Sequence, residues 1–413
     1  MKSGYRKGEV NLEKKFTKDK QFYRFAMYGF LKNLRFFEPF LILFFRDMGM
    51  SFFQIGTLFS IREISTNILE IPTGIIADLY GRRSSMVFSM SSYIIAFLIF
   101  YFFNNFYLFM IAMIFFAMGE AFRTGTHKAL ILEYLRLKNM EDVKVHYYGA
   151  TRSFSQLGSA VNSLIAACIV FYTGNYKVVF LAVLIPYVMN LINLATYPKE
   201  LEGSGRKKKK ETLKDFVSMF KSIEALRAIM NSASFDAFFK TVKEYLQPIL
   251  KYFALSLPVM LMLSDKKRTA VVIGIVYFFI YLLTSYASRY AGVVSGRFRN
   301  LESAMNISYI FGALAIIFSG IFEIWKIHVL TIILFLFLYV FQNFRRPMAV
   351  AFISERIKHS TMASGLSVES QLKTIISAIM APVMGFMVDK IGIGYGMGIF
   401  GMIMLGIFFF IKL

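Results

Sequence analysis

The sequence predicts an all-α membrane protein with twelve transmembrane helices in two pseudo-symmetric six-helix bundles. Three observations predict this fold. Of the 413 residues, 57% are hydrophobic and only 17% are charged, whereas a soluble protein carries about 25% charged residues. Apolar runs long enough to cross a bilayer, which takes about 20 residues, recur along the whole chain. Short sequence matches also relate the first half of the chain to the second.

The apolar runs are separated midway by a hydrophilic stretch, which divides the chain into four predicted parts. We expect a cytoplasmic tail at 1–22, an N-terminal six-helix bundle at 23–197, a cytoplasmic linker at 198–227 and a C-terminal six-helix bundle at 228–413. The predicted membrane helices lie near 23–46, 52–77, 84–104, 106–127, 148–172, 177–197, 228–252, 269–290, 302–322, 327–346, 362–387 and 393–411. A short amphipathic helix is expected in the linker, from Thr212 to Ile223.

The net charge of +22 comes mainly from lysines and arginines in short connectors between apolar runs. Cytoplasmic loops of membrane proteins carry such an excess. Alternate connectors are rich in basic residues, with one exception at Lys266-Lys267-Arg268. The pattern predicts a multi-pass protein of the cell membrane with both termini in the cytoplasm. It also disfavours the nucleic-acid partner that the charge alone would suggest.

Reactive and metal-binding residue types are sparse. Cys168 stands alone, and the four histidines are scattered without metal-ligand spacing. No cofactor is therefore expected. An intramembrane enzyme is disfavoured because no paired aspartates or serine–histidine spacing appears at membrane depth. No phosphate-binding loop of the kind that ATP-driven pumps use is present either.

Three short matches suggest that the two halves are repeats. Phe36–Leu41 corresponds to Tyr245–Leu250, Phe122-Arg123 to Phe344-Arg345, and Ser155–Leu157 to Ser370–Leu372. The matches keep the order of the helices and an offset of roughly 210–220 residues, as expected of parallel six-helix repeats.

One hydrophilic turn carries a known signature. It has the pattern Gly-x-x-x-Asp-x-x-Gly-Arg-Arg, formed by Gly74, Asp78, Gly81, Arg82 and Arg83. The pattern resembles the loop between the second and third helices of the major facilitator superfamily of secondary transporters, although Leu79 stands where that family often has arginine. The resemblance implies alternating access of two six-helix bundles. It also implies that the loop is a gating element, with Asp78 as a latch near the start of helix 11, where a helix N-terminus attracts a carboxylate.

The distribution of charges agrees with this resemblance. Predicted helices 3, 6, 9 and 12 have essentially no ionisable residue in their cores, and in the family these helices are peripheral. A charge inside a membrane helix usually faces a cavity or a partner. In helix 7, the polar residues from Asp236 to Lys251 follow the spacing i, i+4, i+7, i+8, i+11, i+15, which predicts one polar stripe about 100° wide.

The candidate substrate and ion path therefore consists of charged or polar residues in the other helices. Its residues are Lys32, Arg35, Glu38, Glu63, Glu120, Arg123, Arg152, Asp236, Lys240, Lys243, Glu244, Gln247 and Lys373. Two interpretations stay open, because these charges either only pair with one another or also touch substrate. Arg35 and Glu38 could pair at i, i+3 or face Lys243 and Glu244.

Glu63 and Glu120 are candidate proton carriers. Burial favours the protonated form of a carboxylate and a nearby arginine favours the ionised form, so movement of the arginine controls proton uptake. We expect a monomeric, proton-coupled exporter of a small organic solute in the lipid bilayer. The alternatives are an importer of an anionic or zwitterionic nutrient, suggested by the excess of basic residues, and a transport-inactive sensor on the same fold.

Overall fold

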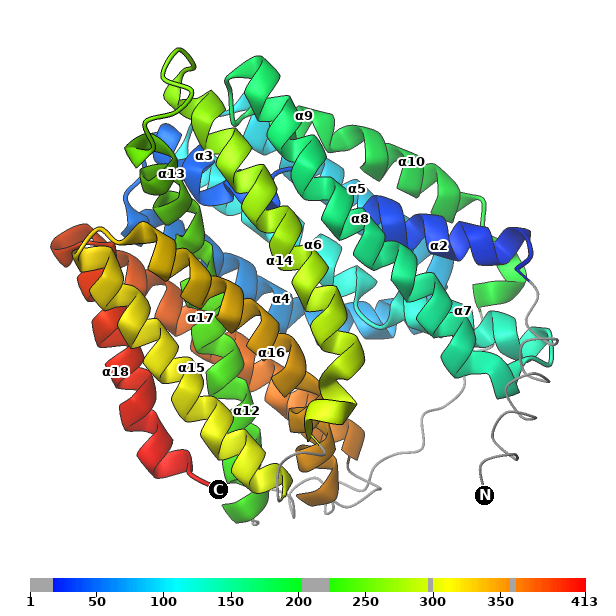
Figure 1. The fold of residues 1–413 in the computed structure, drawn as a ribbon. Helices are drawn as coiled ribbons and strands as arrows, with labels where there is room; N and C mark the ends of the chain where they lie inside the picture. Colours follow the sequence, from blue (N-terminus) through cyan, green and yellow to red (C-terminus); the bar gives the residue numbers. More distant parts are fainter. Residues whose placement is uncertain (1–17, 203–222, 296–299, 357–361) are drawn as a thin grey trace, which may run out of the picture. The chain divides into compact units, whose positions relative to one another are not determined.

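The computed structural model describes residues 18–202, 223–295, 300–356 and 362–413. These residues form helices and short connections without strands (Figure 1). The tail at 1–17 and the linker at 203–222, with nearly all of the predicted amphipathic helix, lie outside the described residues.

The first half of the chain forms α-helices and short 3-10 helices, and side chains cap the starts of two of them. Asp19 accepts a hydrogen bond from the Phe22 amide and caps α2, and Asn105 caps α6 in the same way. The elements are α2 (Lys20–Lys32), η1 (Glu38–Phe40), α3 (Leu41–Asp47), α4 (Phe52–Tyr80), α5 (Arg82–Phe102), α6 (Phe106–Arg123), α7 (Thr126–Leu137), η2 (Glu141–Val143), α8 (Lys144–Thr173), α9 (Val178–Ala182), α10 (Leu184–Ala195) and η3 (Lys199–Glu202).

The second half follows the same plan. Asn300 caps α15, and Gly392, with a φ of +86°, makes the turn between the last two helices. The elements are α12 (Ile223–Val242), η4 (Lys243–Tyr245), α13 (Leu246–Ser256), α14 (Asp265–Ser295), α15 (Leu301–Ile324), α16 (His328–Arg356), α17 (Met362–Ile391) and α18 (Ile393–Ile411).

The chain folds into two compact units that do not coincide with the two halves of the sequence. Unit 1 comprises 1–38, 68–166 and 177–206, and unit 2 comprises 39–67, 167–176 and 207–413. Helices α4 and α8 therefore contribute to both units. The proposed boundary between bundles at 198–227 stays a prediction, because the units divide the chain elsewhere as well.

Each predicted membrane helix overlaps one or more observed helices within the described residues. Nine helices there are long and apolar enough to cross a membrane. The predicted helices 1, 2 and 7 do not meet this criterion as continuous apolar spans. Helices 1 and 7 are interrupted, and α4 contains Arg62, Glu63 and Glu70.

Several predicted helices differ in detail from the observed ones, and helix 6 is divided into α9 and α10. Helix 1 is broken between Lys32 and Glu38, where the Asn33 side chain donates to the Gly29 carbonyl at 2.6 Å. Helix 4 breaks at Gly125, with a φ of +77°, and continues to Leu137. Helix 7 contains the 3-10 turn η4. Helix 10 continues past its predicted end as far as Arg356, with a proline inside it.

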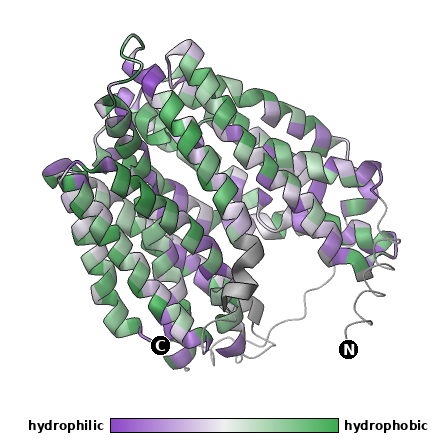
Figure 2. Ribbon diagram, viewed as in Figure 1, coloured by the Kyte–Doolittle hydropathy of each residue, from purple (hydrophilic) through white to green (hydrophobic). Residues whose placement is uncertain are grey.

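Apolar packing holds each unit together. In unit 1, α5 packs against α6 and α10, and α10 packs against α2. In unit 2, α15 packs against α16 and α18, while α12 packs against α17. Hydrophobic residues run along α15 and α18, and hydrophilic residues are frequent on α7 (Figure 2). Many large apolar side chains are exposed on the helices, as expected of surfaces that face lipid.

Candidate functional site

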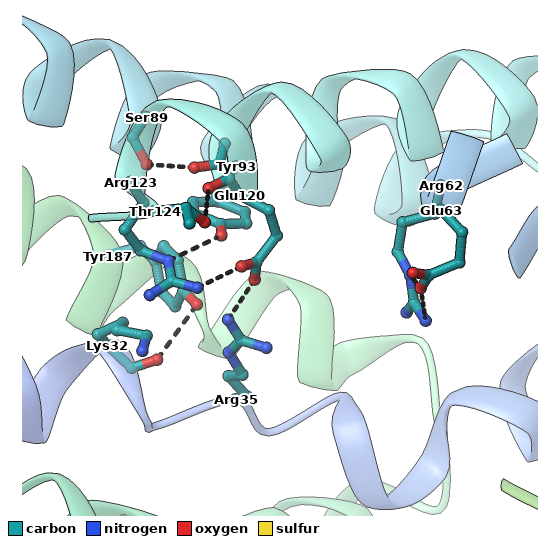
Figure 3. Close-up of polar contacts among 11 residues, drawn as sticks. Lys32, Arg35, Arg62, Glu63, Ser89, Tyr93, Glu120, Arg123, Thr124 and Tyr187 are labelled. Carbon is teal, nitrogen blue, oxygen red and sulfur yellow. Dashed lines mark hydrogen bonds and ion pairs between the residues drawn. The ribbon is translucent and has the colours of Figure 1, made fainter. Parts of the chain in front are cut away.

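A three-residue charge cluster lies in unit 1. The Glu120 carboxylate accepts a hydrogen bond from Arg35 Nη2 at 2.6 Å through one oxygen and pairs with Arg123 through the other (Figure 3). All three side chains are about one-fifth exposed. The carboxylate is thus held between two guanidinium groups.

Helix breaks position the two arginines. Arg35 lies in the segment between α2 and η1, and Arg123 is the last residue of α6. Discontinuous helices build binding sites in many transporters, because their free backbone groups and side chains face a cavity. Glu38 begins η1 and does not share an α-helix with Arg35, but its backbone amide donates to the Arg35 carbonyl at 2.9 Å. Side-chain pairing of the two residues stays a prediction.

Two tyrosines complete the cluster. Arg123 Nε donates to the Tyr93 hydroxyl at 3.4 Å, and the Tyr187 hydroxyl donates to the Lys32 carbonyl at 3.3 Å. Tyr93 lies on α5 and Tyr187 on α10, which are the predicted helices 3 and 6. The search for charged residues did not select Tyr93 and Tyr187, because these helices have no ionisable residue in their cores. Tyrosine within an apolar run was the available sequence signal.

A basic cavity of about 160 Å³ adjoins this cluster in unit 1. Lys32, Arg123 and Arg152 line it, together with residues from α2, α7 and α8. Ser155, one helical turn from Arg152 along α8, lines the same cavity. Sequence analysis did not single out Lys128 or Tyr148, which also line it.

Unit 2 contains a second carboxylate held by two cations. Glu63, whose side chain is 8% exposed, accepts hydrogen bonds from Lys240 Nζ at 2.6 Å and from Arg62 Nη2 at 3.0 Å. Figure 3 shows the Arg62–Glu63 pair. The three side chains line a narrow cavity of about 20 Å³ with Glu244 and Ser377.

Other polar residues of the predicted helix 7 stripe have partners within unit 2, and Lys243 and Gln247 both contact Glu244. Asp236 accepts a hydrogen bond from Gln342 at 2.6 Å, and Lys243 pairs with Glu244 at 3.6 Å. Gln247 accepts one from the Ile42 amide at 2.8 Å. The turn η4 interrupts the straight stripe that the spacing predicted.

Three further polar residues of unit 2 differ in their surroundings. Ser232 donates to Glu369 at 3.0 Å, and Lys373 lies one helical turn further along α17, half-buried. Arg345 is 1% exposed and lies 4.1 Å from the centroid of the Phe235 ring. Of these, only Lys373 was among the predicted path residues.

The predicted gating loop is the turn between α4 and α5 in unit 1. Gly81 has a φ of +94°, which favours glycine. Arg83 donates to the Tyr197 carbonyl at 3.1 Å and lies 3.4 Å from a Glu202 carboxylate oxygen. Gly74 is exposed and Arg82 half-buried. The Asp78 side chain lies outside the described part of the chain, so its latch stays a prediction.

Comparison with known proteins shows the family to which the chain belongs. Residues 25–370 match the family model described as Major Facilitator Superfamily. The chain belongs to the major facilitator superfamily. A curated relative, the uncharacterized MFS-type transporter YxaM of Bacillus subtilis (strain 168), is 24% identical over 240 residues. That match covers 55% of this chain and 58% of the relative's length.

Solved transporter structures are similar to nearly the whole chain. The nucleoside transporter NupG has a TM-score of 0.76 at 14% identity, with 95% of this chain and 98% of that chain covered. A D-xylose-proton symporter has a TM-score of 0.70 at 14% identity, covering 95% and 96% of the two chains. A POT family transporter in complex with 5-aminolevulinic acid has a TM-score of 0.68 at 16% identity, covering 94% and 93%. At these identities the likeness shows the shared fold.

The family match and the apolar helices make the chain a multi-pass membrane protein of a transporter superfamily and not of an enzyme family. Five of the thirteen path residues selected from the sequence lie in two ion clusters, one in each unit. Arg35, Glu120 and Arg123 meet in unit 1, whereas Glu63 and Lys240 meet in unit 2.

Proposed function

We propose that this protein couples transport of a small organic solute to proton movement by alternating access. The observation that carries the proposal is the position of Glu63 and Glu120. Each is a carboxylate in a helix of a membrane protein, and each is held between two cations.

Such a carboxylate works as a proton carrier when its cations move. Two adjacent positive charges keep it ionised, and loss of either one in a partly dry site favours protonation. A solute that competes for the arginine or lysine therefore exchanges an ion pair for a proton. This exchange links solute occupancy to proton occupancy without a further cofactor.

For direction, we propose export across the cell membrane, with both termini in the cytoplasm, as the sequence predicts. Proton-driven uptake of an anionic or zwitterionic solute is the second candidate. It is supported by the excess of cations over carboxylates around the unit 1 cavity.

Purified protein in proteoliposomes tests the proposal. We expect an imposed pH gradient to drive accumulation of at least one solute from a panel of organic acids, amino acids, sugars and apolar amines. Vesicles acidic inside and vesicles acidic outside, with protein orientation determined by proteolysis, distinguish export from uptake. Vesicles with a sodium gradient alone serve as the control.

Solute flux that does not depend on the pH gradient, or that depends only on the sodium gradient, would contradict proton coupling. No flux of any solute, from protein shown to be folded, would instead favour the transport-inactive sensor.

A further inference from the structure

The cavity in unit 1 has an unusual charge composition. Four cationic side chains line it, and no carboxylate does so among the described residues. The four are Lys32 on α2, Arg123 on α6, Lys128 on α7 and Arg152 on α8. Lys32 and Arg123 are half-buried, and Lys128 and Arg152 are exposed. A cleft lined by charges of one sign attracts a solute of the opposite charge.

Three of these cations form no direct ion pair within the described residues, although Glu120 and Glu38 act electrostatically on Lys32. Arg123 pairs with Glu120, but Lys32, Lys128 and Arg152 form no ion pair with any residue that the structure describes. Lys128 instead lies 5.7 Å from the centroid of the Tyr148 ring. The positive charges of these three side chains are therefore not neutralised by a direct ion pair with a described residue.

A histidine provides an independent indication of a ligand. The His127 ring stacks on Tyr28, with centroids 3.7 Å apart, and lines the cavity. Its Nε2 atom is buried without a hydrogen-bond partner in the described part of the chain. Buried polar atoms are nearly always satisfied, so an orphan atom at a cavity wall points to a bound polar group.

The size and the remaining lining restrict what fits. A volume of about 160 Å³ corresponds to roughly five water molecules at ~30 Å³ each. This holds a carboxylate or phosphate group but not a whole drug-sized molecule, whose pockets span about 300–1,000 Å³. Thr151, Ser155 and Tyr148 add hydroxyl groups that can donate to oxyanion oxygens.

From this geometry we infer that the cavity is a binding subsite for the oxyanion group, carboxylate or phosphate, of a small organic anion. The inference rests on the proposed transport function and names the substrate class. Arg123 belongs both to the cavity and to the Glu120 cluster. A bound oxyanion therefore competes with Glu120 for the same guanidinium, which connects substrate binding to the proton-carrying carboxylate.

Equilibrium binding to purified protein in neutral detergent tests the inference without requiring transport. The probes are inorganic phosphate and succinate, with glucose and methylammonium as neutral and cationic comparisons. We expect both anions, and neither comparison, to raise the melting temperature of the wild type by mass action. Arg152→Gln should weaken anion binding about tenfold or more, because a charge-assisted hydrogen bond is lost.

Lys177→Gln is the matched control. Lys177 is a basic residue of the same unit, but it contacts Asn104 and Tyr101 and not the cavity. Its variant should bind the anions like the wild type. Arg152→Lys, which keeps the charge, should restore part of the affinity, so that loss of folding is distinguished from loss of the site.

Equal anion affinities of Arg152→Gln and Lys177→Gln would overturn the inference. Stabilisation by phosphatidylglycerol alone, without a response to either soluble anion, would also overturn it, since the oxyanion would then be a lipid headgroup. Proton-coupled flux restricted to uncharged solutes would contradict this subsite while leaving the proposed coupling intact. Anion binding without proton-coupled flux would support this subsite and contradict the proposed coupling.

Discussion

At the scale of single residues, buried arginines in this protein have two kinds of surroundings. Arg35 and Arg123 share a carboxylate, so their interactions can be exchanged for a ligand or a proton. Arg345 instead donates to the Ser308 hydroxyl at 3.0 Å and to the Asn231 side chain, and lies against Phe235. Neutral partners and a ring face hold this guanidinium in place, which indicates a structural role.

We expect Arg345→Lys to destabilise the protein by about 1.5–3 kcal/mol, the range for hydrogen bonds to a charged group. Lysine keeps the charge but lacks the planar fork and the ring stacking. Thermal or denaturant unfolding in detergent measures the change. Arg346→Lys is the control, because that neighbour is exposed, and an equal loss in both variants would contradict a specific role for Arg345.

At this scale, the sequence predicted which charged residues to consider, but it did not predict their ion-pair partners on distant helices. Charge placement in apolar runs selected Glu63, Glu120 and Lys240 as candidates. Each carboxylate has one partner close in sequence, Arg62 for Glu63 and Arg123 for Glu120. The other partner is distant in sequence, as in the Lys240–Glu63 pair, and helical periodicity contains no information about contacts between helices. Lys128 lies just beyond the predicted end of helix 4 at residue 127, and His127, at that end, is interpreted from the sequence as an interfacial hydrogen-bonding residue and not as a proton relay.

At the scale of elements, the important departures are the breaks between α2 and α3, between α6 and α7, and between α12 and α13. The first and third lie beside the matched motifs containing Pro39 and Pro248. A proline removes one amide donor and clashes with the carbonyl four residues before it, here that of Arg35 or Glu244. A local cause for these breaks was therefore visible in the sequence. Their extent also depends on tertiary contacts, such as the hydrogen bond from the Ile42 amide to Gln247.

Unit 2 also contains a helix cap supplied by another helix. Both oxygens of Asp389, near the end of α17, accept hydrogen bonds from the first amides of α4, those of Phe52 and Phe53, at 2.9 and 2.7 Å. Gly385 allows this approach, because a Cβ there would clash with the Phe52 backbone. The carboxylate both satisfies unpaired amides and interacts favourably with the helix dipole.

Asp389→Ala should therefore cost ~1 kcal/mol, as loss of an N-cap typically does. Hydrogen exchange should accelerate at the amides of Phe52 and Phe53, which mass spectrometry of peptides covering them can detect. Asp265→Ala, at an exposed helix start, is the comparison and should leave that peptide unchanged. Unaltered exchange in Asp389→Ala would show that the cap contributes little to the start of α4.

At the scale of the whole molecule, the sequence predicted the superfamily, the all-α fold and the approximate positions of the long helices. It did not predict that 39–67 and 167–176 group in unit 2 with the second half of the chain. That grouping depends on contacts between distant helices, which the proposed alternating access would remake during the cycle. The sequence repeats and the loop motif are compatible with each conformation of the cycle, so they do not predict which conformation is observed.

The central claim is that Glu63 and Glu120 carry the coupled proton. The most direct measurement follows internal pH with a trapped dye while solute enters proteoliposomes, alongside solute exchange without a gradient. Glu63→Gln and Glu120→Gln should lose solute-driven proton movement while retaining exchange, since glutamine does not titrate. Glu302→Gln, in the exposed pair with Arg356, should behave like the wild type. Wild-type proton movement in both the Glu63 and the Glu120 variant would contradict the account.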